Sequence, residues 1–399
     1  METYDVIIAG GGPAGASAAT HLARRGARVL LAEQKKFPRP KLCGEFISPE
    51  CARHFERLAV ADQMFAARPA TLAETVFYSR NGSHVSVPSS WFGSTGLALG
   101  LSRAEMDERL LRRAAAAGAH VLESASVSDL IMEEGRVQGV KLKQGSTETS
   151  YRAAVTIDAT GRARALTRHL SPRRNHSPRP PMIAFKAHLE ETQVADAACE
   201  IYFYRGGYGG LSSVENGLSN LCFIASARDV RACGADADRV MREVVCQNLR
   251  ARFTLATARL HSPWLAVSLE GFGRHEVAAA KGLLAIGDAA SFIDPFTGSG
   301  MLMALESGEL AATTIGDYLH AGAQSQSLDD LRVRYAAAYQ RVFAARLRVC
   351  SFIRRAAFIP GFAETAIRIF GANERLRRRL ARATRGRTTE TYSVAERAR

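Results

Sequence analysis

The chain has 399 residues, of which 47% are hydrophobic and 23% charged, and these values exclude a small disulfide-stapled domain and a wholly disordered chain. Its formal net charge is +14, and residues 331–399, with 17 Arg, no Lys and four Glu, carry nearly all of it. No apolar run approaches the roughly 18 residues of a membrane-spanning helix. We therefore expect a cytoplasmic protein that does not span a membrane.

The cysteines and histidines give no sign of a metal centre. The seven cysteines never stand in a CxxC spacing, and the ten histidines form no HxxH or HExxH pattern. Tetrahedral zinc sites need such clustered ligands. We expect no bound metal and no disulfide framework.

The first 33 residues follow the order strand, tight turn, helix, strand. Residues 4–9 and 28–32 are apolar runs, and between them GGGPAG leads into a helix over 16–25. Glu33 ends the second strand, where a carboxylate can accept hydrogen bonds from ribose hydroxyls. The turn is a GxGxxG motif, whose glycines permit the turn, the approach of a pyrophosphate and the packing of the helix. The residues predicted to bind the ADP half of a dinucleotide are Gly10, Gly12, Pro13, Ala14, Gly15 and Glu33.

Strands and helices continue along the chain. Residues 75–87 predict a β-hairpin, residues 102–117 a helix, and the Pro-rich stretch 171–181 a crossover between domains. Residues 183–270 read as strands interrupted by one helix over 236–251. Further strands are expected at 120–122, 125–133, 136–143, 155–157 and 283–286, and helical segments at 300–319 and 328–383.

A second glycine-rich segment follows the last predicted strand. In GDAASFIDPFTGSGMLMALESGELAA, the strand delivers Asp288 at its carboxyl end, where the side chain can bind the hydroxyls of a ribityl chain. The amides at the start of the next helix can stabilise negative charge on a reduced flavin. The predicted flavin-binding residues here are Gly287, Asp288, Pro295, Gly298, Ser299 and Gly300.

These motifs together resemble those of the geranylgeranyl reductase family, within the p-hydroxybenzoate hydroxylase-like superfamily of FAD-dependent oxidoreductases, monooxygenases and halogenases. The resemblance covers about residues 1–320 and implies FAD as the cofactor. LSRAEMDERLLRRAAAAGAHV is similar to the family helix whose leading arginine, here Arg103, reaches the flavin. PRPKLCGEFISP is similar to the family's KxCG segment beside the flavin ring. The resemblance implies cofactor contacts for Cys43, Gly44, Arg103 and Val127.

The same resemblance implies three active-site candidates, Lys41, Cys43 and Tyr208. Cys43 is either a small thiol packed beside the cofactor or a group that takes part in the chemistry. Tyr208, in RGGYGGLSS, either lines the substrate cavity or is an aromatic residue of a surface turn.

Two departures from the superfamily affect the expected chemistry. Thr160 stands in DATGR where hydroxylases that use NAD(P)H directly commonly carry an Asp, and no second GxGxxG is present. The reductant is therefore expected to be NAD(P)H that binds transiently, or a protein electron donor. The WxWxIP segment of tryptophan halogenases is also absent, so halogenation is a minor alternative.

The Arg-rich C-terminal segment predicts a basic amphipathic helix. Leu331, Tyr335, Tyr339 and Cys350 recur at helical spacing, while Arg346 and most other arginines fall elsewhere. We expect a helix packed on the flavin domain with a solvated arginine face. The alternative is peripheral contact with anionic lipid. We expect no nucleic-acid binding, because no recognition fold accompanies the charge.

The predicted fold is α/β, and α+β overall. It consists of a discontinuous Rossmann-like FAD-binding domain (1–170 and 271–330), a mixed-sheet substrate domain (68–100 and 172–270) and a helical segment (331–399). The expected function is FAD-dependent reduction of a C=C bond in a hydrophobic, lipid-like molecule by flavin hydride. The alternative is hydroxylation of a polyketide-like or phenolic lipid by an FAD-dependent monooxygenase, and a further minor alternative is a non-catalytic prenyl-binding module. The oligomeric state stays open.

Overall fold

The computed structural model describes residues 2–92, 96–168, 170, 182–270, 272–294, 296, 298–321, 327–357 and 361–385. The predicted domain crossover at 171–181 and the predicted flavin contact of Pro295 lie outside these residues.

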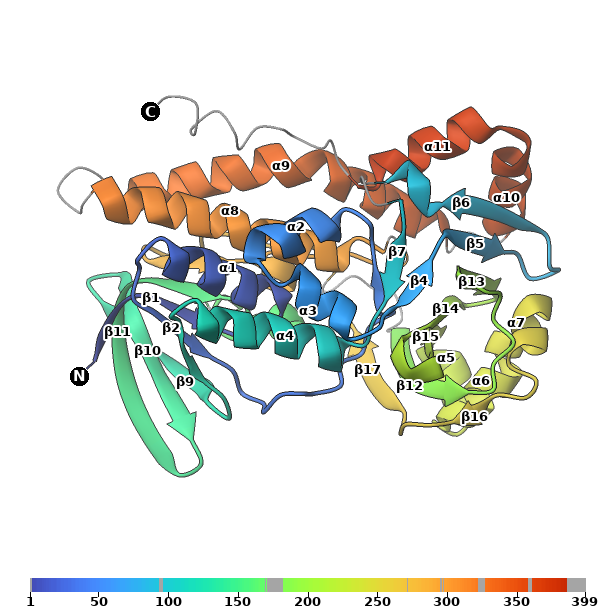
Figure 1. The fold of residues 1–399 in the computed structure, drawn as a ribbon, viewed down its shortest axis with the longest axis horizontal. Helices are drawn as coiled ribbons and strands as arrows, with labels where there is room; N and C mark the ends of the chain where they lie inside the picture. The colour runs from blue at the N-terminus through green and yellow to red at the C-terminus, as the bar shows by residue number, and fades with distance from the viewer. Residues whose placement is uncertain are drawn as a thin grey trace.

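A seven-stranded sheet forms the centre of the first layer, in the order β8-β2-β1-β11-β10-β9, with β19 beside β11. The strands around β1 are parallel, whereas β9, β10 and β11 form an antiparallel ribbon (Figure 1). The strands are β1 Thr3–Ala9, β2 Val29–Ala32, β8 His120–Leu122, β9 Ser126–Glu133, β10 Arg136–Gln144, β11 Thr147–Asp158 and β19 Leu283–Ala285. Because β1, β11 and β19 are parallel, their carboxyl ends meet at one edge of the sheet.

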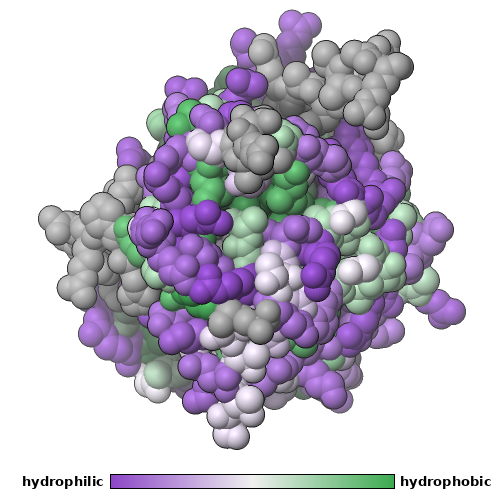
Figure 2. Space-filling model, turned by 90° about the vertical axis from the view of Figure 1, so that its left-hand side faces the viewer, coloured by the Kyte–Doolittle hydropathy of each residue, from purple (hydrophilic) through white to green (hydrophobic). Residues whose placement is uncertain are grey.

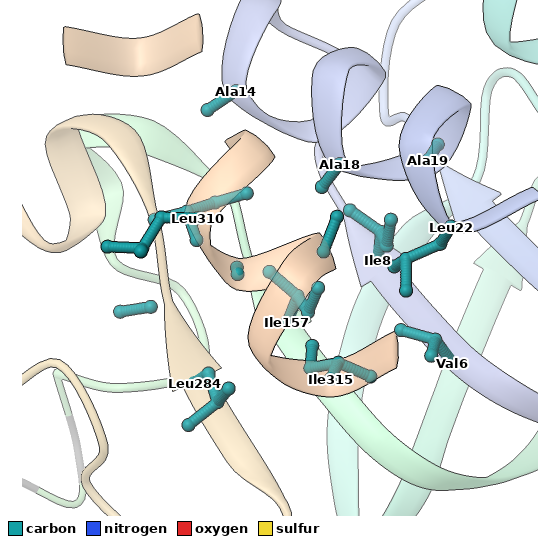
Figure 3. Packing of buried hydrophobic residues seen from close by; sticks show 14 of the residues in the cluster. Val6, Ile8, Ala14, Ala18, Ala19, Leu22, Ile157, Leu284, Leu310 and Ile315 are labelled. Carbon is teal, nitrogen blue, oxygen red and sulfur yellow. The ribbon is translucent and has the colours of Figure 1, made fainter. Parts of the chain in front are cut away.

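Helices α1 (Pro13–Arg24), α4 (Arg103–Ala116) and α8 (Gly300–Ala321) pack on this sheet, with α1 in contact with both of the others. Figure 3 shows the apolar side chains that fill the space between α1, α8 and the strands. Gly308 allows the close approach of the two helices, because a Cβ there would lie 2.4 Å from the Ala14 carbonyl oxygen. This packing brings the start of α8 beside the start of α1.

An eight-stranded sheet forms the second layer, in the order β16-β12-β15-β14-β13-β5-β6, with β17 beside β12. One face is covered by α5 (Ala227–Ala232), α6 (Ala237–Glu243) and α7 (Leu249–Thr254), and a separate hydrophobic core lies between them. The strands are β5 Glu74–Tyr78, β6 His84–Pro88, β12 Met182–Glu190, β13 Ala198–Tyr204, β14 Gly207–Ser213, β15 Ser219–Ser226, β16 Arg259–Leu260 and β17 Leu265–Leu269.

The prediction of one continuous helix over 236–251 is wrong. The helix ends at Glu243, a short 3-10 turn follows over Val245–Gln247, and α7 begins after Asn248. The extended backbone of Asn248 interrupts the helix, and its side chain accepts hydrogen bonds from the amides of Arg250 and Ala251. Asparagine is a favoured N-cap, so it begins a new helix here.

Short elements connect the layers. The segment that follows β2 contains two helices that the sequence analysis did not predict, α2 (Cys51–Leu58) and α3 (Ala61–Ala66). A three-stranded sheet joins β3 (Phe46–Ile47), β7 (Ala98–Gly100) and β4 (Ala70–Leu72), and β18 (Gly273–Arg274) pairs with β20 (Ser291–Phe292).

The C-terminal segment forms α9 (Leu328–Ala357), α10 (Phe362–Ala372) and α11 (Glu374–Ala383). Helix α9 lies along α8, and α10 and α11 lie beside β6 at the opposite end of the molecule from the β9–β11 ribbon (Figure 1). Tyr335, Tyr339 and Phe343 of α9 are buried. Arg346 was expected among the solvated arginines but is also buried, because it forms an ion pair with Glu306 of α8 at 2.6 Å.

Hydrophilic residues cover most of the described surface at the end that carries the β9–β11 ribbon (Figure 2). None of the helices in the described ranges is both long enough and apolar enough to cross a membrane.

Candidate functional site

The turn between β1 and α1 has the geometry that its three glycines predict. Gly10 has φ +110°, and a Cβ there would lie 2.3 Å from the carbonyl oxygen of Ala159. A Cβ at Gly15 would lie 1.9 Å from the Gly10 carbonyl oxygen, so only glycine fits. A Cβ at Gly12 would meet no atom within 4 Å. The backbone at Gly12 therefore faces open space at the start of α1, which is where a helix binds a pyrophosphate.

Glu33 lies at the end of β2 and is 3% exposed. Its Oε2 accepts a hydrogen bond from the amide of Gly11 at 2.8 Å, and its Oε1 accepts one from the amide of Lys35 at 2.9 Å. The guanidinium of Arg39 lies 3.5 Å from Oε2. These partners fix the carboxylate beside the glycine turn, and its remaining lone pairs can accept hydrogen bonds from ribose hydroxyls.

A cavity begins at Gly12 and continues between the two large sheets. Segments that lie far apart in the sequence form its wall, including the KxCG segment, the start of α4, and the loop and helix that follow β19. The predicted site residues that line this cavity are Gly12, Pro13, Ala14, Lys41, Cys43, Gly44, Arg103, Gly287, Asp288, Gly298 and Gly300.

Six other predicted residues lie outside the cavity lining. Gly10, Gly15 and Glu33 belong to the glycine turn and the end of β2 described above, and the other three lie elsewhere. Val127 is a partly buried residue of β9 that packs against a cluster including Val140 and Leu142, and Ser299 is fully buried before α8. Tyr208 is buried on β14, where its hydroxyl donates to Asp294 and accepts a hydrogen bond from the amide of Phe296 at 2.9 Å. Burial raises the pKa of Asp294 despite the hydrogen bond from Tyr208. Tyr208 thus joins the second sheet to the loop after β20, and it is not a surface turn residue.

Lys41 and Arg103 place positive charge at the cavity. Arg103 forms a bidentate pair with Asp107, with both N–O distances 2.7 Å. Burial disfavours the charged form of Arg103 and would lower its pKa. Asp107 and Cys43 favour the charged form more strongly, so the pKa of Arg103 is raised. Burial and the charge of Arg103 lower the pKa of Lys41, although Asp288 opposes the shift. Lys41 is therefore a readier proton donor than an ordinary lysine.

Glu45, which no sequence motif singled out, lines the cavity and is fully buried. Its Oε1 accepts hydrogen bonds from Lys186 Nζ at 3.0 Å and from the amide of Arg103 at 2.9 Å, and its Oε2 lies 2.6 Å from His188 Nε2. Burial opposes ionisation, but His188 and Lys186 more than offset it and lower the pKa of Glu45. Glu45 has φ +54°, a left-handed conformation that is rare outside glycine and asparagine. Its partners on β12 hold it there.

Cys43 lies next to this cluster. Its Sγ accepts a hydrogen bond from the amide of Glu45 at 3.4 Å, and its carbonyl oxygen accepts one from Asn220 Nδ2 at 3.1 Å. Cys222, two residues along β15, also lines the cavity, and burial raises the pKa of its thiol. The second sheet therefore supplies polar groups to the wall opposite the glycine turn. Among the described residues, no group of three or more His, Cys, Asp or Glu side chains is arranged to hold a metal ion.

An apolar cluster continues the wall beyond these polar groups. Along each strand of the second sheet, alternate side chains face away from helices α5–α7. Phe272 and Phe292 stack with ring centroids 4.5 Å apart, and Phe296 packs edge-on against Tyr208. The buried members of the cluster are Ala184, Tyr208, Ile224, Leu269 and Phe292. This surface suits a hydrophobic molecule better than a polar one.

The glycine turn, the carboxylate that ends β2 and the loop that leads into α8 define a dinucleotide-binding flavoprotein. A family model described as an FAD binding domain matches residues 3–345, and the chain belongs to that family. It is an FAD-dependent oxidoreductase, and the predicted fold class, cofactor FAD and resemblance to geranylgeranyl reductases are confirmed.

Relatives of similar length include reductases of lipid-like molecules. A menaquinone reductase of Mycolicibacterium smegmatis is 29% identical over 320 residues, which cover 77% of this chain and 75% of that protein. A digeranylgeranylglycerophospholipid reductase of Methanoculleus marisnigri is 29% identical over 328 residues, which cover 80% of this chain and 78% of that protein.

Solved structures share the fold. A flavin-dependent brominase has a TM-score of 0.82 at 21% identity, covering 96% of this chain and 93% of its own. A geranylgeranyl bacteriochlorophyll reductase-like protein of Thermoplasma acidophilum has a TM-score of 0.74 at 20% identity, covering 91% of this chain and 88% of its own.

Proposed function

We propose that this oxidoreductase reduces a C=C bond of an isoprenoid-like lipid or lipid quinone. The observation that carries the proposal is the aromatic and aliphatic wall opposite the flavin-binding segments, which includes Leu42, Leu269 and Phe292. The named activities of the two lipid reductases support the same substrate class.

The residues present fit FAD. Gly12 and Gly300 leave open space where a Cβ would touch nothing, Glu33 is fixed for the ribose, and Asp288 faces the cavity. When bound, FAD supplies two-electron redox chemistry. Arg103, held by Asp107, would place a fixed positive charge beside it. The wall around Phe292 would exclude water and orient the alkene.

The net reaction adds two electrons and two protons across the double bond. The electrons would come from NAD(P)H or from a protein donor. For the proton delivered to substrate carbon, the structure offers the Lys41 ammonium, whose lowered pKa favours proton release, and the neighbouring Cys43 thiol. After transfer, the donor would regain its proton from solvent.

Hydroxylation of a phenolic lipid is the second candidate. The aromatic rings of Phe46 and Phe292 in the cavity wall favour an aromatic substrate, and a neutral Lys41 could accept a phenolic proton.

Single-turnover product analysis tests the proposal. The purified protein should be yellow and release FAD on denaturation. After anaerobic reduction, it would be mixed with menaquinone or a geranylgeranyl lipid, and the product analysed by mass spectrometry. We expect the product to gain two hydrogens without oxygen. Incorporation of labelled oxygen from O₂ into a phenolic lipid would establish the second candidate instead, and a colourless protein that takes up no FAD would overturn both.

A further inference from the structure

The outward face of α11 carries an unusual concentration of one charge. Four exposed arginines occupy positions i, i+3, i+4 and i+7 and therefore form one stripe along the helix. We call this set the arginine stripe, and its members are Arg375, Arg378, Arg379 and Arg382. The opposite face of α11 packs on the protein, where Arg377 lies over the ring of Trp91 at 5.4 Å.

The protein itself does little to neutralise the arginine stripe. Arg375, Arg378 and Arg379 form no ion pair with any carboxylate of the described ranges. The fourth member, Arg382, makes a long hydrogen bond to the Trp91 carbonyl oxygen at 3.4 Å. Like charges three and four residues apart repel one another and destabilise a helix. A negatively charged partner outside the chain would remove this repulsion.

Exposed apolar side chains lie on α11 and on α10, the helix that contacts it. Leu376 of α11 is 44% exposed, and Ile369 of the adjoining α10 is 50% exposed. Basic residues next to exposed aliphatic residues are typical of a helix that lies in a membrane interface, with arginines on phosphate groups and the apolar side chains among the acyl chains. Nucleic-acid binding gives no role to the aliphatic residues. Bases of a single-stranded nucleic acid stack on exposed aromatic rings, and α11 contains no aromatic residue.

The same helix leads directly to the cavity. Two residues after α11 ends, Arg385 donates a hydrogen bond to the carbonyl oxygen of Gly298 at 2.8 Å. Its guanidinium also lies over the rings of Phe92 at 4.9 Å and Phe46 at 5.9 Å. Gly298 and Phe46 both line the cavity. The arginine stripe is thus joined, through a few residues, to the wall of the cavity.

We infer that α11 is a docking surface for anionic lipid bilayers. Phosphate groups of the bilayer occupy the arginine stripe, and Leu376 and Ile369 contact its apolar region. Docking there brings the bilayer close to the part of the cavity wall that Arg385 contacts, and a lipid substrate enters from the bilayer on this side. This inference goes beyond the proposed reaction, because it concerns where the protein lies rather than which bond it changes.

Vesicle sedimentation of the full-length, FAD-loaded protein tests the inference. We expect sedimentation with vesicles of phosphatidylcholine and phosphatidylglycerol at low salt, little with phosphatidylcholine alone, and release as salt shortens the Debye length toward about 8 Å. Arg375→Glu/Arg378→Glu/Arg379→Glu should weaken the partition coefficient by about 100-fold or more. Flavin absorbance should be unchanged, because none of the three residues contacts the cavity.

A matched control makes the same change of charge elsewhere. Arg228→Glu/Arg231→Glu/Arg242→Glu alters three exposed arginines of α5 and α6 and should bind vesicles within threefold of the unaltered protein. Equal losses in the two triple variants would show attraction by net charge alone and overturn the assignment to α11. A yellow protein that ignores anionic vesicles at low salt, or that binds single-stranded RNA and not vesicles, would also overturn it, while leaving the proposed reaction untouched.

Discussion

Glu33 is the residue that we expect to recognise the ribose of FAD. Glu33→Ala removes a carboxylate that is already fixed by two backbone amides, so FAD should bind more weakly by roughly 1.5 to 3 kcal/mol. Fluorescence titration of the apoprotein with FAD would measure the change. Asp62→Ala, an exposed acid of α3, should leave the affinity unaltered. Equal affinities for the Glu33 variant and the unaltered protein would place the ribose elsewhere.

Glu45 provides a second prediction, about stability. Glu45→Gln leaves the ammonium of Lys186 buried without a carboxylate, and such an unpaired buried charge typically costs about 3 to 5 kcal/mol. Urea unfolding would measure this loss. The double variant Glu45→Gln/Lys186→Met should recover much of it, because the uncompensated charge is gone. Additive losses in the double variant would show that the two residues do not act as a pair.

At the residue scale, the geometry of the glycine turn and the placement of Glu33 and Asp288 were predictable because each follows from local spacing. Their contacts with FAD stay predictions. The role of Glu45 could not be predicted, because its partners Lys186 and His188 are 141 and 143 residues away and no local sequence pattern connects them. The sequence left open whether Tyr208 lines the substrate cavity or lies in a surface turn, and only the structure shows that its hydroxyl donates a hydrogen bond to Asp294. The catalytic roles of Lys41 and Cys43 stay predictions.

At the scale of elements, Glu309 ties α8 to α2. Its carboxylate lies 2.8 Å from Arg57 and 3.1 Å from His54. Burial opposes ionisation, but His54 and Arg57 more than offset it and lower the pKa of Glu309 from 4.5 to about 2. A carboxyl group whose pKa is lower in the folded than in the unfolded protein stabilises the fold at pH values above the pKa of the unfolded state. This stabilisation is lost as the pH falls through the pKa of the folded state.

The expected result is a pH-dependent effect of Glu309→Gln. The variant should be less stable than the unaltered protein by about 3 kcal/mol near pH 6, and the difference should shrink as the pH falls from 4.5 toward 2. Denaturant unfolding at several pH values would show it. Asp317→Asn, on the same helix but in an exposed pair with Arg25, should cost less than 1 kcal/mol at any pH. A loss that is independent of pH would mean that Glu309 acts by packing alone.

Helices and strands with a strong periodic pattern were predictable. The N-terminal βαβ unit and the helix begun by Ser102, whose Oγ accepts from the amide of Glu105 at 3.2 Å, follow from local signals. The short helices α2 and α3 carry weak signals and are stabilised by a core that includes residues of α4 and α8. These two helices form because of tertiary packing, which cannot be deduced from the local sequence.

At the scale of the whole molecule, the C-terminal segment packs against part of the cavity wall. Ending the chain after Asn373 removes α11 and the contact between Arg385 and Gly298. FAD should stay bound, because the glycine turn and Glu33 are intact, but its ring should become more accessible. Iodide quenching of flavin fluorescence should therefore increase. A chain that ends after Arg385 keeps this contact and should resemble the full-length protein. Unchanged quenching after removal of α11 would show that the helix does not shield the flavin.

The order in which the site is assembled from the chain has a consequence for biosynthesis. The predicted cofactor site joins the turn at 10–15 to Gly287 and Asp288, which line the same cavity, and β19 lies beside β11 in the sheet. During translation, the first βαβ unit emerges long before these partners exist. FAD therefore cannot be fully enclosed until about three quarters of the chain has left the ribosome. Until then α1 lacks the cover of α8, and the apolar side chains between them stay exposed to chaperones. FAD is thus expected to bind late in synthesis. A shortage of FAD would therefore affect the folding of completed chains and not of nascent chains.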